Sequence, residues 1–238
     1  SVWVGSQRYP AIFLGDQHPD FKNIIKTMRA GLNMSLAGFS YWTADVFGLD
    51  GKTTPEIHQR YAQWALFSPI ARYFYRPSGI DDTRYPWSFG EEVEDHFRRL
   101  VNLRYHLLPL YYSLAWKAYQ SGHPIIRPLF LNFPQDKAAW RIDDQFLLGD
   151  HIMFCPVVQA GAKQRQVYFP SGVWYDFKTD RKFAGGQSVK VDAPLDQLPM
   201  FVKDSTILVL GPQKANIADD YGFNILEVHV WGDGGKYD

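Results

Sequence analysis

Residues 11–32 read "AIFLGDQHPDFKNIIKTMRAGL", a short apolar run that passes through a polar turn into a helical pattern. Residues 11–15 predict a buried strand, and residues 21–32 predict a helix because their apolar side chains recur at the spacing of one helix face. Asp16 directly follows the strand. In parallel βα units the working residues stand at the carboxyl ends of strands, so Asp16 is the first candidate for catalysis.

Strands and helices continue to alternate through the first half of the chain. Residues 34–42 predict a second strand, residues 55–67 a helix, and residues 124–133 a third strand. Between them, residues 91–120 predict the longest helix, with a bend at Pro109. This alternation favours parallel βα units.

The pattern changes near residue 145. From there the chain consists of short β-type runs separated by Gly, Pro and Asp turns, and no helical pattern stands out. These features predict an all-β unit, a β-sandwich. The expected fold class is therefore α/β followed by all-β.

Composition narrows the classes of partner. The 238 residues include 25 basic and 25 acidic side chains, and no Lys/Arg block indicates nucleic acid or an anionic membrane surface. No apolar run reaches 18 residues, so we expect no membrane span. The chain lacks a signal-like leader but need not begin at its natural start, so the compartment stays open. Cys155, in "IMFCPVV", is expected to be a buried, unreactive thiol.

Aromatic residues make up 16 % of the chain, and most are expected in a large core. An aromatic surplus beside carboxylates also suits a sugar-binding cleft, because the C–H faces of sugar rings pack on aromatic planes. The loop at residues 73–87 mixes Arg, Asp, Tyr and Trp. This loop could line such a cleft, or it could be a salt-bridged surface loop.

Two carboxylates follow predicted strands. Asp16 comes after the first strand, and Asp45 comes after the second. Carboxyl groups at the ends of neighbouring parallel strands point into one cleft, and glycoside hydrolysis needs such a pair, roughly 5–5.5 Å apart for retention and 6.5–9.5 Å for inversion. The alternatives stay open: Asp16 could cap the following helix, and Asp45 could be a turn or capping acid.

A metal site is the other hypothesis for residues 15–20, "GDQHPD". The block superficially resembles a metallophosphoesterase motif, in which Asp16, His18 and Asp20 would be ligands. That chemistry needs further ligand motifs elsewhere, and the seven His are scattered without forming one. We therefore expect no metal and no organic cofactor.

Several ordered blocks resemble one known family. They are "GSQRYPAIFLGD" (5–16), "GLNMSLAGFSYWTADVFGL" (31–49), "QWALFSPIARYF" (63–74), "RYPWSFG" (84–90), "LRYHLLPLYYSLAWKAYQSGHPIIRPLF" (103–130), "DDQFLLGDHIMFCPV" (143–157), "VYFPSGVWYDF" (167–177) and "APLDQLPMFV" (193–202). Together they are similar to glycoside hydrolase family 31, the retaining α-glycosidases that include α-glucosidases, α-xylosidases and α-galactosidase-like members.

The resemblance implies a domain plan and a catalytic residue. Residues 1–138 would be the C-terminal part of a (β/α)8 TIM barrel with strands six to eight, residues 139–210 a proximal β-sandwich, and residues 211–238 the start of a truncated distal β domain. Asp16 matches the family's acid/base aspartate, and Asp45 matches the aspartate after strand seven that shapes the sugar subsite. The nucleophilic aspartate after strand four would lie outside this chain.

Two substitutions depart from the family pattern. Phe21 stands where the family usually has Trp, which keeps an aromatic face but loses an indole N–H. Phe74 stands where common α-glucosidases have a His that bonds a sugar hydroxyl. A site built to bond a hydroxyl discriminates strongly, so the preferred sugar stays open.

The function implied is that of a retaining exo-α-glycosidase acting on terminal α-linked sugars. Asp16 would be the general acid/base, with Phe21, Trp42, Asp45, Phe74 and Trp87 around the substrate. Its partners would be a carbohydrate substrate and the missing N-terminal part of the same enzyme, with a homo-oligomer left open. The chain alone is expected to be inactive. The alternative is a non-catalytic carbohydrate-binding or structural module.

Overall fold

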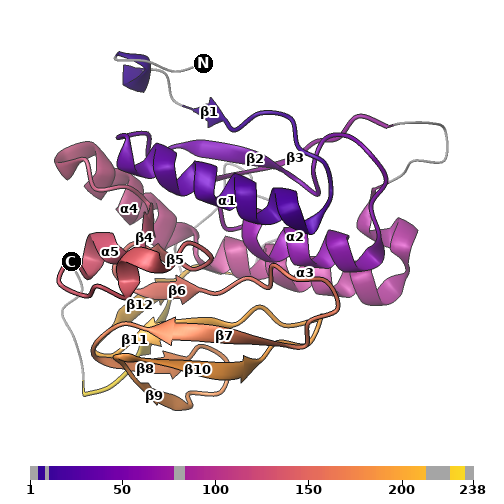
Figure 1. The fold of residues 1–238 in the computed structure, drawn as a ribbon. Coiled ribbons are helices and arrows are strands. Elements are labelled where there is room, and N and C mark those ends of the chain that lie inside the picture. The colour runs from indigo at the N-terminus through magenta and orange to yellow at the C-terminus, as the bar shows by residue number, and fades with distance from the viewer. Residues whose placement is uncertain (1–4, 9–10, 78–83, 213–225, 234–238) are drawn as a thin grey trace.

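The computed structural model describes residues 5–8, 11–77, 84–212 and 226–233 (Figure 1). Three strands, β1 (Ile12–Phe13), β2 (Trp42–Val46) and β3 (Ile70–Tyr73), form a parallel sheet in the order β1-β2-β3. Helix α1 (Phe21–Leu36) connects the first two strands, and α2 (Pro55–Ala65) connects the next two. The prediction of parallel βα units is therefore confirmed for this part of the chain.

Helix α1 is longer than its sequence pattern predicted, and the predicted strand at residues 34–42 is wrong. The helix runs on to Leu36, because Ser35 continues its buried face, and it ends just before Gly38, whose φ of 87° is left-handed. Strand β2 begins only at Trp42 and is buried throughout. Asp45 therefore lies inside β2 and does not follow it.

The third parallel strand is β3, which the sequence analysis did not assign. The predicted strand at residues 124–133 is instead β4 (Ile126–Pro128) followed by the short helix α5 (Leu129–Asn132). Strand β4 pairs antiparallel with β5 (Phe146–Leu148) at the edge of another sheet. Pro128 suits this place, because an edge strand tolerates a residue that cannot donate a backbone hydrogen bond.

The predicted helix at residues 91–120 is two helices, α3 (Glu91–His106) and α4 (Leu108–Ser121). The break falls at Leu107, and Pro109 stands in the first turn of α4. Proline is tolerated there because it has no N–H to contribute to the preceding turn. The described residues also contain the short 3-10 helices η1 (Ser6–Arg8), η2 (Pro86–Phe89) and η3 (Ala139–Arg141).

Every described element from residue 146 onward is a strand, as predicted. A six-stranded antiparallel sheet has the order β4-β5-β6-β11-β8-β9, β7 pairs with β10, and β12 pairs with β13. The remaining bounds are β6 (Ile152–Phe154), β7 (Gln164–Phe169), β8 (Val173–Asp176), β9 (Lys182–Ala184), β10 (Gln187–Asp192), β11 (Met200–Lys203), β12 (Ile207–Leu210) and β13 (Glu227–Val230). The expected distal domain at 211–238 lies mostly outside the described residues.

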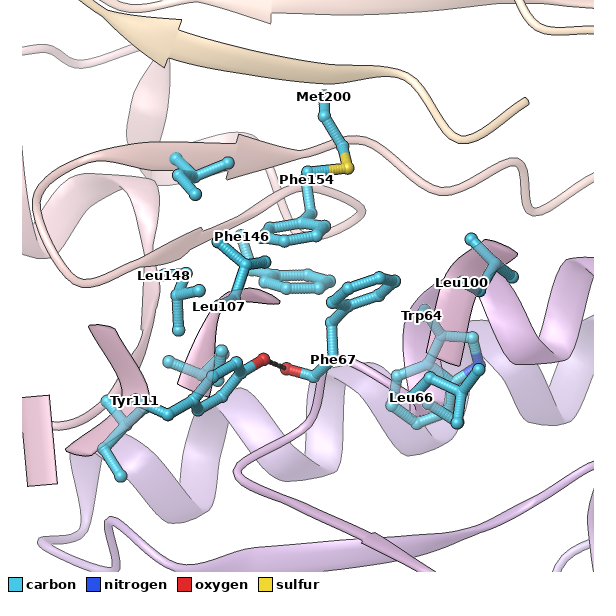
Figure 2. Packing of buried hydrophobic residues seen from close by; sticks show 14 of the residues in the cluster. Trp64, Leu66, Phe67, Leu100, Leu107, Tyr111, Phe146, Leu148, Phe154 and Met200 are labelled. Carbon is cyan, nitrogen blue, oxygen red and sulfur yellow. Dashed lines mark hydrogen bonds between the residues drawn. The ribbon is translucent and has the colours of Figure 1, made fainter. Parts of the chain in front are cut away.

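One hydrophobic core joins the helices to the six-stranded sheet (Figure 2). Phe67, just after α2, packs on Phe154 of β6 with ring centroids 4.8 Å apart, and Phe154 stacks on Phe146 of β5. The Tyr111 hydroxyl of α4 donates a hydrogen bond to the Phe67 carbonyl at 2.7 Å. The helical part and the antiparallel part are thus packed as one body.

A second core cluster lies where β7 and β10 meet the six-stranded sheet. Phe169 of β7 contacts Phe183 of β9 and Phe201 of β11 at centroid distances of 4.8 and 4.7 Å. Cys155 is fully buried in this cluster, and burial raises the pKa of its thiol to about 12. The prediction of a buried thiol is confirmed, and the raised pKa agrees with the expectation that it is unreactive.

Arg60 of α2 reaches from the helical part into the antiparallel part. Its buried guanidinium donates to the carbonyls of Ala162, Ala193, Pro194 and Gln197 at 2.8 to 3.4 Å, and to the side chain of Gln63. Burial lowers the pKa of Arg60 to about 10, so the side chain remains a cation at neutral pH. A single buried cation therefore ties α2 to the loop at residues 193–197.

Candidate active site

The two faces of the parallel sheet carry different residues. Side chains alternate along a strand, so Trp42 shares one face of β2 with Ala44 and Val46, and Asp45 lies on the other. The Trp42 ring packs on α1 so closely that a Cβ at Gly31 would lie 2.6 Å from it. Its indole N–H donates to Ser35 Oγ at 2.9 Å. Trp42 therefore supports β2 against α1 and does not share the face of Asp45.

Asp45 forms a buried ion pair with Arg72. The two residues are directly opposite in the register of β2 and β3, and Arg72 Nε donates to Asp45 Oδ1 at 2.6 Å. Asp45 is fully buried, and within the described part of the chain its Oδ2 has no hydrogen-bond partner. Burial raises the pKa of Asp45 above its ordinary value, Arg72 opposes that shift, and the charge of Asp16 adds to it.

Two phenylalanines flank the guanidinium of Arg72. Its central carbon lies 4.5 Å from the ring centroid of Phe13 and 4.8 Å from that of Phe74, both within cation–π range. The rings are 38 % and 50 % exposed. An open aromatic surface with a cation at its centre therefore covers the buried carboxylate of Asp45.

Asp16 is exposed beside this group, in the turn after β1. Among the described residues nothing donates a hydrogen bond to its carboxylate, whereas Asp20 caps α1 by accepting from the Asn23 N–H at 2.6 Å. The alternative role of Asp16 as a helix cap is therefore wrong. Gly15, with a φ of 93°, makes the turn that places Asp16 at the carboxyl end of the sheet.

The remaining ligands of the metal hypothesis have other surroundings. Asp20 is engaged by the helix N-terminus, and His18 Nδ1 lies 3.3 Å from the carbonyl oxygen of Asp50. Within residues 5–8, 11–77, 84–212 and 226–233, no three His, Cys, Asp or Glu side chains are grouped to hold a metal ion.

In the same residues, no helix has the length and apolar character that crossing a membrane requires.

Phe21 and Trp87 contact neighbours other than Asp45 and Arg72. Phe21 is the first residue of α1 and packs against the main core. Trp87 is exposed in η2 and stacks on Tyr85 with ring centroids 4.7 Å apart, and Tyr85 stacks in turn on Tyr73. Tyr73 occupies the helix-covered face of β3, since it alternates with Arg72. Charge therefore links Asp16 to Asp45, and contacts through Arg72 link Asp45 to Phe74. Trp42 lies on the opposite face of β2, and Phe21 and Trp87 stay proposed pocket residues.

Sequence reasoning missed Arg72, Gln17 and Tyr61. Arg72 was visible only as one cation in an unassigned segment, and its partner becomes evident only from the register of β2 and β3. Gln17 looked like an ordinary turn residue but is 4 % exposed, and its side-chain oxygen accepts from the Tyr61 hydroxyl at 2.9 Å. A polar residue buried in a turn leaves no periodic signal in a sequence.

Comparisons with known proteins agree with this arrangement. The family model "Glycosyl hydrolases family 31 TIM-barrel domain" matches residues 1–114, and "Glycosyl hydrolase family 31 C-terminal domain" matches residues 122–208. The parallel strands β1, β2 and β3 thus lie in the range of the TIM-barrel model, and β4 to β12 begin in the range of the C-terminal model. The chain belongs to glycoside hydrolase family 31.

Individual relatives cover nearly the whole chain. An α-xylosidase of Saccharolobus solfataricus is 35 % identical over 97 % of it, and α-glucosidase 2 of Bacillus thermoamyloliquefaciens is 32 % identical over 98 %. A Flavobacterium johnsoniae family 31 dextranase, solved with glucose, has a TM-score of 0.90 and 30 % identity over 98 % of the chain. The chain spans 32 %, 29 % and 30 % of these three proteins, about a third of their length.

Proposed function

We propose that this chain supplies the acid/base residue of a retaining exo-α-glycosidase, with β1, β2 and β3 as strands six to eight of a (β/α)8 barrel. The expected barrel boundary at residue 138 moves to before β4, which pairs in the antiparallel sheet: we propose that the barrel ends near residue 121, that a β-sandwich follows to residue 210, and that 211–238 belong to a distal β domain. The observation that carries the proposal is the exposed carboxylate of Asp16 beside the buried Asp45–Arg72 pair. The names of the relatives support the same chemistry.

In the proposed reaction Asp16 donates a proton in the first step and accepts one in the second. It first donates the proton to the glycosidic oxygen as the bond to the anomeric carbon breaks, while a carboxylate outside this chain bonds to that carbon. Asp16 then takes a proton from the water that displaces the enzyme carboxylate. The two displacements at one carbon retain its configuration, and neither step uses a metal or an organic cofactor.

The neighbouring residues would hold the sugar. We propose that the exposed rings of Phe13 and Phe74 pack on its C–H face, because they are the aromatic surfaces nearest the ion pair. Asp45 is too deeply buried for a sugar to reach, and we propose that it acts through Arg72, whose guanidinium it holds beneath the sugar. Phe21 and Trp87 remain proposed pocket residues, Phe21 at the start of α1 and Trp87 in the ring stack with Tyr85 and Tyr73.

The remaining barrel strands are the proposed partner of the chain. Three parallel strands leave the outer edges of β1 and β3 without a neighbour in the described sheet, and a barrel must close on itself. The 238 residues expressed alone should therefore release no nitrophenol from nitrophenyl α-glycosides. Sustained turnover by the purified chain would contradict the proposal that the nucleophile lies outside it.

Asp16→Asn in the intact protein tests the proposed role directly. The variant should lose most turnover of glycosides with poor leaving groups and lose less with dinitrophenyl glycosides, whose leaving groups need no protonation. A panel of α-glucosides, α-xylosides and α-galactosides identifies the sugar. If the wild type hydrolyses none of them but binds oligosaccharides as tightly as Asp16→Asn does, the chain belongs to a binding module.

A further inference from the structure

Gln17, which follows the proposed acid/base residue, is held at both ends of its side-chain amide. The Tyr61 hydroxyl of α2 donates to Gln17 Oε1 at 2.9 Å, and Gln17 Nε2 donates to the carbonyl oxygen of Gly15. Gln17 is 4 % exposed and Tyr61 is fully buried. The two residues on either side of Asp16 are therefore bonded to each other and anchored to α2.

The backbone of the same turn is fixed by the loop at residues 47–51. The carbonyl oxygen of Gln17 accepts from the N–H groups of Leu49 and Asp50 at 2.7 and 3.2 Å. Gly48 approaches so closely that a Cβ there would lie 2.9 Å from the backbone nitrogen of Pro19. The turn that carries Asp16 is thus pinned from the side of the neighbouring strand.

Buried Arg84 fixes that loop in turn. Its guanidinium donates to the carbonyl oxygens of Phe47, Gly48 and Gly51, with 2.7 Å to Gly48. The backbone around Asp16 consequently has few ways to rotate, whereas the Asp16 carboxylate itself is exposed. Its direction is set by its neighbours.

We propose that Gln17 and Tyr61 are positioning residues for the proton transfer of Asp16. They fix the Gly15–Gln17 backbone and so aim the carboxyl group at the glycosidic oxygen. This inference rests on the proposed function. A misplacement of a catalytic group by about 1 Å can lower the rate roughly 100-fold. Hydrogen bonds that fix the position of Asp16 can therefore have a large effect on the rate.

The chemistry of both side chains fits this task. An amide can accept from Tyr61 and donate to Gly15 at once, whereas a carboxylate at position 17 could only accept. Burial, together with the charges of Asp45 and Asp20, raises the pKa of Tyr61 above its ordinary value. The Tyr61 hydroxyl therefore keeps its proton and remains the donor throughout the pH range of an assay.

The test uses Tyr61→Phe and Gln17→Met in the intact protein, with Tyr111→Phe as the matched control. Tyr111 is also a buried tyrosine whose hydroxyl donates one hydrogen bond, at 2.7 Å to Phe67, but it lies in α4. For glycosides with alkyl leaving groups, kcat/KM should fall about 10- to 100-fold in Tyr61→Phe and Gln17→Met. With dinitrophenyl glycosides the fall should be less than about threefold, because protonation of the leaving group no longer limits the rate. Tyr111→Phe should change kcat/KM by the same factor for both classes of glycoside.

The outcomes separate this inference from the proposed function. If Asp16→Asn discriminates between the leaving groups but Tyr61→Phe and Gln17→Met behave like Tyr111→Phe, positioning is refuted and the function stands. If the wild type hydrolyses no α-glycoside, the function fails, and the inference fails with it. The double variant should lose no more than the worse single variant, since both changes release the same turn. Should Tyr61→Phe not fold, Gln17→Met alone decides.

Discussion

The carboxylate of Asp45 and the guanidinium of Arg72 lie opposite each other on adjacent parallel strands, with Nε 2.6 Å from Oδ1. Asp45 is fully buried, whereas the side chain of Arg72 is 40 % exposed. A buried carboxylate thus has a cation that solvent can reach. The same ion pair therefore links β2 to β3 and holds the guanidinium of Arg72 at the exposed face of the sheet.

Replacing Arg72 by Met should destabilise the chain, because it leaves the carboxylate of Asp45 buried without its cation. Breaking a fully buried pair costs about 3–5 kcal/mol, and the exposure of Arg72 reduces that to about 1–3 kcal/mol. Urea unfolding at pH 7 measures the loss. Adding Asp45→Asn should recover much of it, because an amide needs no countercharge. If the double variant is no more stable than Arg72→Met alone, the unpaired charge is not the cause.

The same variant should change how stability depends on pH. The folded-state pKa of Asp45 is raised above 3.8, chiefly by burial. For a raised pKa, the contribution to stability is complete below the unfolded value and is lost as pH rises through the folded value. Arg72→Met removes the cation that opposes the raised pKa. The loss of folding stability with rising pH should therefore be larger in this variant and should extend to higher pH values above 3.8. Asp45→Asn should abolish it, and unfolding curves at several pH values check this.

Arg60→Met should be costly because it removes the donor of the buried Ala193 carbonyl oxygen and of three part-buried carbonyl oxygens. Each buried acceptor left without a donor costs about 1–3 kcal/mol, so we expect a loss of at least that size. Arg29→Met is the control: Arg29 also links the helical and antiparallel parts, through Asp143, but both side chains are at least half exposed. Exposed pairs contribute about 0–1 kcal/mol. Equal losses in the two variants would contradict the role given to Arg60.

Gly48→Ala should be worse than Gly122→Ala, although the two glycines have φ values of 75° and 74°. The left-handed conformation costs any other residue about 1–2 kcal/mol at either site. At Gly122 a Cβ would meet nothing within 4 Å, whereas at Gly48 it would press on the backbone of Gln17, His18 and Pro19. Gly48→Ala should therefore lose additional stability and, in the intact protein, activity. Thermal melting and kcat/KM measure both, and indistinguishable variants would exclude close packing at Gly48.

Phe74→His should shift the sugar preference, because it restores the residue that common family 31 α-glucosidases have there. The imidazole can bond a sugar hydroxyl, which the Phe74 ring cannot. In the intact protein we expect the ratio of kcat/KM for an α-glucoside over an α-xyloside to rise about tenfold or more. Phe13→His, on the other side of Arg72, is the control for general loss of aromatic surface. If the ratio of kcat/KM for the two glycosides is similar in both variants, Phe74 does not determine the sugar preference.

The features that the sequence predicted correctly are local ones. The order of strand, turn and helix around Asp16 follows from spacing within about twenty residues, although β1 is partly exposed and not buried as predicted. A disturbance near Pro109 follows from the missing N–H of proline, although it is a break between two helices and not the predicted bend in one. The antiparallel half was recognisable from its turn residues. Each of these depends on neighbours along the chain, which a single sequence displays.

The errors concern contacts between segments far apart in the sequence. Residues 34–36 joined α1 because Ser35 is buried against Trp42, a partner that their apolar pattern does not reveal. Strand β3 has four residues, too few for a periodic signal, so the partner of Asp45 went unseen. Residues 124–133 satisfied the pattern of a buried strand, but pairing with β5 placed Arg127 in the antiparallel sheet. Tertiary pairing, which overrides local preference, decided all three.

Arg60 and Tyr61 are adjacent in α2. Arg60 donates hydrogen bonds to the loop at residues 193–197, and Tyr61 donates one to Gln17 in the turn that carries Asp16. Exchanging the C-terminal half for that of a relative would therefore also alter the support of the turn that carries Asp16. A chimera should retain activity only when its replacement loop presents carbonyl oxygens to Arg60. If the proposed function holds, the antiparallel part is a structural component of the active site, and a relative's antiparallel part cannot replace it freely.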